Sequence, residues 1–230
     1  MFTTLKYFVA TAIFAAGFAA TAFAATDESE KARALLFDAK HIAVLPAGTE
    51  LIYKFERLPS NAALLGPGFT DDMKIKIESE GAPGKKNIAI QVFSGERARD
   101  PQKITDMDGN PMVVIFLDNS VGHYMQLSGG DRAYLKNKFS KTLGDASKLT
   151  AVKIDYKGTM VDGFRISVSP YADDPQRAKM RGFETAEFTI ALSDKIPGYL
   201  AQMIANYTNT DKTAPTLVEK TTLDGVGEVK

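Results

Sequence analysis

Apolar and polar residues alternate with a period of two over much of this chain, and this pattern constrains the fold more than any other feature. Residues 71–79 show it most clearly, because Met73, Ile75 and Ile77 are separated by charged side chains. Such alternation is typical of antiparallel strands that bury one face and expose the other. The sequence therefore predicts a sheet that is largely antiparallel.

About nine segments have this character, and turns rich in Gly, Pro, Asn and Asp separate them. Residues 112–117 are almost wholly apolar, which indicates a strand buried on both faces. A sheet of this size usually curls. We therefore expect a mainly β fold with a few helices, in which a curved antiparallel sheet forms a half-open or closed barrel. The expected strands are residues 49–57, 71–79, 87–93, 112–117, 151–156, 164–169, 184–192, 199–207 and 216–223.

Two further segments have helical spacing. Residues 27–40 begin with acidic side chains and carry apolar residues along one stripe. Residues 132–143 follow a Gly-Gly-Asp loop that provides an N-cap, and Gly144 ends the segment. We expect these helices to cover the concave side of the sheet.

The first 24 residues have the features of a cleavable signal peptide. Lys6 precedes an apolar run, and Ala22-Phe23-Ala24 is a cleavage motif of the A-x-A type. A retained membrane anchor is the alternative, since the apolar run is nearly long enough to span a bilayer. We predict a signal peptide over residues 1–24 and a single β-rich periplasmic domain over residues 25–230. Without cysteine, the mature chain has neither a disulfide nor a lipidated cysteine.

The charge balance excludes one class of partner. Lys6 is the only charged residue in the signal peptide, so the remaining 206 residues carry 27 basic and 28 acidic side chains. A nucleic-acid-binding domain needs a basic excess to displace counterions. We therefore expect no nucleic acid partner.

Residues that carry out chemistry are scarce. The chain has two histidines, His41 and His123, and neither stands in the spacing of a metal site or beside a nucleophile elbow. Asp173 and Asp174 are adjacent carboxylates before a proline, a pattern more typical of a turn or cap than of an acid–base pair. We expect no catalytic residue, no metal and no cofactor.

Large apolar residues on the inner face of the predicted strands either fill the core or line a cavity for an acyl chain. On the helix predicted over residues 132–143, Arg132 and Lys136 lie on a basic side, which is either an ordinary solvated face or a contact for anionic lipid head groups. The second reading predicts peripheral contact with a membrane. The cavity hypothesis assigns the lining to Phe55, Met73, Ile75, Ile77, Phe188 and Ile190.

Three blocks of sequence, residues 110–117, 127–139 and 188–198, resemble a family of uncharacterised exported bacterial proteins. In overall layout the chain is also similar to the periplasmic lipoprotein carriers and their outer-membrane receptors, the LolA/LolB type. These proteins have a leading helix, a strongly curved antiparallel sheet and helices over a hydrophobic hollow. The second resemblance implies a carrier fold, and it supplies no matching functional arginine on a strand.

Three hypotheses about function follow. The leading one is a non-enzymatic periplasmic carrier or binding protein for an apolar or amphiphilic ligand such as a lipid. The second is a structural module that binds another envelope protein through a sheet edge or through residues 134–139. The third is a hydrolase of envelope polymers that uses His123 or the Asp173–Asp174 pair.

Overall fold

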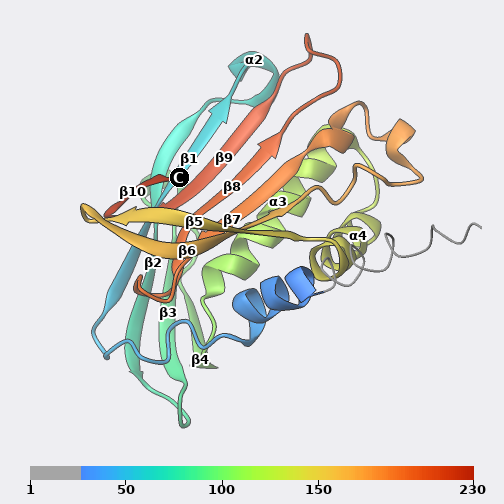
Figure 1. Ribbon diagram of the computed structural model, residues 1–230. Helices are drawn as coiled ribbons and strands as arrows, with labels where there is room; N and C mark the ends of the chain where they lie inside the picture. The colour runs from blue at the N-terminus through green and yellow to red at the C-terminus, as the bar shows by residue number, and fades with distance from the viewer. Residues whose placement is uncertain (1–26) are drawn as a thin grey trace, which may run out of the picture.

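The computed structural model describes residues 27–230, with Glu228 described by its backbone alone (Figure 1). The predicted signal peptide, residues 1–24, lies outside the described residues.

Ten strands form one antiparallel sheet in the order β10-β5-β6-β7-β8-β9-β1-β2-β3-β4. The sheet curls and is not closed, because β10 and β4 are its two edges. This confirms the predicted mainly β fold in its half-open form. The strands are β1 (Glu50–Pro59), β2 (Phe69–Glu80), β3 (Lys86–Val92), β4 (Gln102–Met107), β5 (Lys148–Tyr156), β6 (Thr159–Val168), β7 (Glu187–Leu192), β8 (Leu200–Tyr207), β9 (Leu217–Leu223) and β10 (Val226–Val229).

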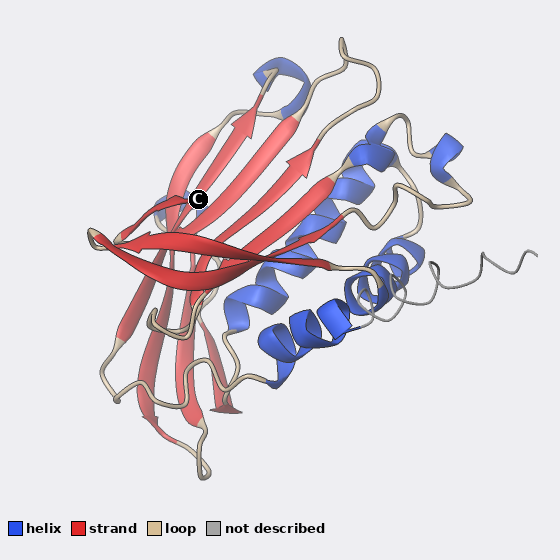
Figure 2. Cartoon of the chain, viewed as in Figure 1, coloured by secondary structure: helices blue, strands red, loops and turns tan. Residues whose placement is uncertain are grey.

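The helices pack on one side of this sheet, as the sequence predicted (Figure 2). The N-terminal helix spans residues 27–38 and ends in a π-helical turn, η1 (Ala34–Asp38). Two longer helices follow in the middle of the chain, α3 (Pro111–Ser128) and α4 (Arg132–Asp145). The short elements are α2 (Ala62–Leu65), η2 (Gly95–Arg97), η3 (Arg177–Lys179) and η4 (Phe183–Thr185).

The prediction of a strand over residues 112–117 is wrong, because these residues form the first turns of α3. Asn110 is the N-cap, and its side-chain oxygen accepts a hydrogen bond from the Met112 N–H at 3.0 Å. Pro111 occupies the first helical position, where its missing N–H costs nothing. A short apolar run is ambiguous between strand and helix, and the Asn-Pro start decides for the helix here. Strands β4 and β10, which the alternation did not reveal, raise the count to ten.

Local turn chemistry fixes the register of the β5–β6 hairpin. Tyr156 pairs with Thr159, so Lys157 and Gly158 form a two-residue loop, as the sequence indicated. Both loop residues have positive φ, 52° and 80°, as a type I′ turn requires.

The core lies between the inner face of the sheet and the helices. Aromatic rings dominate its centre: Phe188 of β7 packs against Phe139 of α4 at 4.7 Å between ring centroids and against Tyr207 of β8 at 5.7 Å. Tyr124 of α3 stacks on Tyr171 at 3.9 Å. These contacts fix α3 and α4 against the sheet and so set the space between the two helices.

Candidate ligand groove

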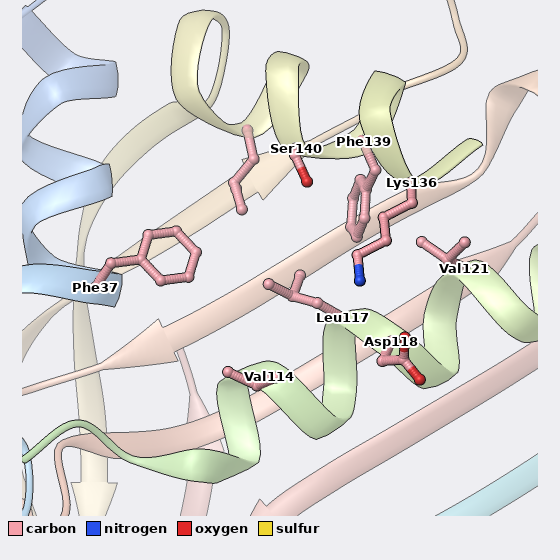
Figure 3. A pocket seen from close by; sticks show the side chains of 9 residues that line it. Phe37, Val114, Leu117, Asp118, Val121, Lys136, Phe139 and Ser140 are labelled. Atoms are coloured by element: carbon pink, nitrogen blue, oxygen red, sulfur yellow. The ribbon is translucent and has the colours of Figure 1, made fainter. Parts of the chain in front are cut away.

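An apolar groove lies between the N-terminal helix, α3 and α4 (Figure 3). Its volume is about 290 Å³, at the lower end of the range of roughly 300–1,000 Å³ that small-molecule sites occupy. We call it the helix groove. It is lined by Phe37, Val114, Leu117, Asp118, Val121, Lys136, Phe139, Ser140 and Leu143.

Helical spacing brings these side chains together. Val114, Leu117 and Val121 recur every three or four residues and therefore lie on one face of α3. Phe139 and Leu143 do the same on α4 and are buried, whereas Val114 is 58% exposed. Phe37 closes the groove from the N-terminal helix and is 48% exposed. Exposed apolar side chains that gather in a concavity often mark a binding site.

Charged side chains lie toward the end of the helix groove that is remote from Phe37 (Figure 3). Asp118 on α3 forms an ion pair with Arg132 on α4, at 2.8 Å between Oδ1 and the guanidinium. Lys136 is one turn further along α4, and its ammonium has no hydrogen bond or ion pair with any residue of the described chain. Because Arg132 offsets Asp118, the ammonium of Lys136 gives this end of the groove a net positive charge.

The residues predicted to line a cavity lie elsewhere. All six are buried, and none lines the helix groove; their contact with a ligand stays a prediction. The two residues predicted to contact a lipid head group are both exposed. Lys136 lines the helix groove itself, whereas Arg132 forms an ion pair with Asp118, which lines it. Sequence reasoning missed Val114 and Leu117 because it assigned their segment to a strand. The six residues predicted to line a cavity are Phe55, Met73, Ile75, Ile77, Phe188 and Ile190.

His123 belongs to an ionic cluster on the inner face of the sheet, in which Glu219 is buried and His123 and Arg57 are partly buried. Its Nδ1 lies 2.6 Å from Oε2 of Glu219 on β9, and Glu219 Oε1 lies 3.4 Å from Nε of Arg57 on β1. The hydroxyl of Tyr207 donates toward Glu219 Oε2 at 3.4 Å and the Ser120 carbonyl at 3.3 Å. Burial, and after it the charge of Glu219, raises the pKa of the Tyr207 phenol, so this group remains a donor. The cluster joins α3 to three strands.

The two adjacent aspartates do not act as a pair. Asp173 is exposed, whereas Asp174 is fully buried. Asp174 Oδ1 accepts hydrogen bonds from the Tyr134 hydroxyl and the Gln176 N–H, both at 2.7 Å, and Oδ2 lies 3.4 Å from Nζ of Lys138. Burial alone raises the pKa of Asp174, but these donors outweigh it and the pKa is lowered. Asp174 therefore ties α4 to the loop before η3.

Within residues 27–230, no helix is long and apolar enough to cross a membrane. The same residues contain no group of three or more His, Asp or Glu side chains arranged to hold a metal ion.

No protein-family model and no curated protein matches the chain. The solved structures that are similar to it include two with 11% identity each. One is the structure of MucB in complex with MucA(peri), with a TM-score of 0.39 over 87% of this chain and 56% of that one, so the chain spans little more than half the length of the chain that it matches. The other is the Mycobacterium tuberculosis lipoprotein LppX, with a TM-score of 0.31 over 91% of this chain and 97% of that one.

Proposed function

We propose that this protein is a non-enzymatic binding or carrier protein of the bacterial envelope, and that its ligand is an amphiphile with one apolar chain and an anionic head group. The observation that carries the proposal is the helix groove, in which an apolar wall ends at the unpaired ammonium of Lys136. The signal peptide predicted from residues 1–24 supports the place of action.

The wall of the groove supplies the affinity. Each buried methylene of a ligand contributes about 0.8 kcal/mol. A groove of about 290 Å³ accepts a single short chain between Phe37, Val114 and Leu117. Because Phe37 and Val114 are already half exposed, a bound chain would also cover apolar surface that the protein leaves in water.

The charged end supplies selectivity rather than affinity. An ion pair with an exposed lysine contributes about 1 kcal/mol or less. With Asp118 offset by Arg132, that contribution favours a sulfate, phosphate or carboxylate over an ammonium group.

Calorimetric titration tests the proposal with n-decyl sulfate below its micellar concentration, because this head group stays ionised at every pH of interest. We expect Lys136→Gln to weaken binding about threefold to fivefold, as expected for an exposed ion pair. Val114→Asp should weaken it at least about tenfold, because a charge then desolvates in the apolar wall.

Matched controls separate the groove from the rest of the surface. Lys141→Gln removes a cation from the same helix, and Val44→Asp places a carboxylate at another exposed apolar position; neither residue lines the helix groove. Both controls should bind as the wild type does. Equal affinity of the wild-type chain for decyl sulfate and decyltrimethylammonium, unchanged by Lys136→Gln, would contradict the assignment.

A further inference from the structure

His41 is a fully buried imidazole whose two nitrogens are both engaged. Nε2 donates to the carbonyl of Leu35 at 2.7 Å, and Nδ1 accepts from the N–H of Asn110 at 3.0 Å. Because a backbone N–H can only donate, the nitrogen that faces it must be unprotonated. This geometry therefore holds His41 in its neutral form.

The two partners of His41 belong to the two helices that carry opposite walls of the helix groove, although neither residue lines it. Leu35 lies in the π-helical turn of the N-terminal helix, two residues before Phe37. Asn110 is the N-cap of α3, four residues before Val114, and its side-chain amide also donates to the Tyr53 hydroxyl and the Gly198 carbonyl, both at 2.8 Å. The imidazole is thus a link between the helix that carries Phe37 and the rigid part of the fold.

Few charged groups face this imidazole. Asp108, from the loop between β4 and α3, is the one carboxylate that favours its protonated form among the described residues, and Tyr199 packs edge-on against the ring at 5.2 Å between centroids. Tyr53 is connected to the imidazole only through its hydrogen bond with Asn110. Burial raises the pKa of the Tyr53 phenol far above its ordinary value, so this group stays neutral. Burial lowers the pKa of His41 more than Leu35 and Asp108 raise it.

We propose that His41 is an acid-sensitive latch, and that its protonation releases the N-terminal helix and opens the helix groove at the Phe37 wall. A proton on Nδ1 would place two donors against each other and break the bond to Asn110. The latch is a property of the fold, and only its consequence, release of an amphiphile in acid, rests on the proposed function.

The size of the effect follows from proton linkage. The released imidazole has the ordinary pKa of 6.5, and the latched imidazole resists protonation. The stabilisation of the latched state is therefore complete above pH 6.5 and is lost as the pH falls below it. Between pH 7.5 and pH 5.5 the equilibrium for release should rise by at most about tenfold, the limit reached when the latched imidazole takes up no proton in this range.

Hydrogen exchange of the amides of residues 31–39 tests the latch in the full chain without a ligand. After correction for intrinsic exchange rates, we expect protection to fall by up to about tenfold between pH 7.5 and pH 5.5. His123→Gln is the matched control, because His123 is the only other histidine; it should keep the fall, whereas His41→Gln should abolish it. If neither His41→Gln nor His41→Asn folds, the test is the fall in protection of the wild type and of His123→Gln, which should be the same.

Three results would overturn the latch: constant protection in the wild type, a fall that disappears with His123→Gln, or protection at pH 5.5 as high as that of the amides of β8.

Decyl sulfate titrations at the two pH values separate this proposal from the previous one. Loss of protection without any binding would leave the latch and refute the ligand. Binding that is equal at both pH values, with constant protection, would support the ligand and refute the latch.

Discussion

Replacing Glu219 with alanine is expected to destabilise the fold more than the same substitution at any other Asp or Glu of the sheet. Glu219 is 4% exposed and faces Arg57 and His123, whose side chains are 16% and 28% exposed. Breaking a buried ion pair typically costs about 3–5 kcal/mol, because it leaves an uncompensated charge behind. Since water reaches both partners in part, we expect a loss of about 3 kcal/mol in the free energy of unfolding.

Urea denaturation followed by circular dichroism measures this loss. In a chain of this length, about 3 kcal/mol corresponds to a fall in Tm of about 6–12 °C. A double-mutant cycle with His123→Ala should give a coupling energy of about 1–2 kcal/mol, because the two side chains share one short hydrogen bond.

Glu56→Ala is the matched control. Glu56 is on β1 and pairs with Lys220 on β9 at 3.6 Å, so the same two strands are joined by an ion pair whose side chains are about one third exposed. This pair should contribute less than about 1 kcal/mol. If Glu219→Ala cost no more than Glu56→Ala, the cluster would not hold α3 to the sheet, and apolar packing alone would do so.

Two further predictions concern the other buried polar groups. Asn110→Ala should cost about 3 kcal/mol in urea denaturation, because it removes the cap of α3 and leaves the Tyr53 hydroxyl and the Gly198 carbonyl without their partner; a loss below about 1 kcal/mol would contradict this account. Asp174 has a lowered pKa, so its stabilisation is present above pH 3.8 and is lost as the pH falls below that value. Stability curves of the wild type and Asp174→Asn should therefore converge in acid, and a constant difference down to pH 2 would refute the stabilisation of the Asp174 carboxylate by Tyr134, Gln176 and Lys138.

Much of the sheet could be predicted because alternation reports directly on strands with one buried face. Met73, Ile75 and Ile77 are all at most 3% exposed, as their spacing in β2 indicates. Strand β4 escaped prediction for the opposite reason: as an edge strand it is mostly exposed and has no apolar alternation. Strand β10 has four residues, too few for a period to appear.

The candidate site could be predicted only in part. Lys136 and Arg132 stood out because charge on an amphipathic helix is visible in one segment of sequence. The apolar wall was not visible, since it forms only when α3, α4 and Phe37 meet, and Phe37 is separated in sequence by 77 to 106 positions from the lining residues of the other two helices. Reading Asn110-Pro111 as a helix start would have placed Val114 and Leu117 on a helix face.

Methyl NMR of the full chain during a titration with decyl sulfate tests the central claim most directly. Our account predicts that the methyl resonances of Val114, Leu117 and Leu143 in the helix groove shift with the added ligand, and that those of Ile75 and Ile190 in the core do not. Shifts confined to the core isoleucines, or no shift in any of these methyls, would contradict it.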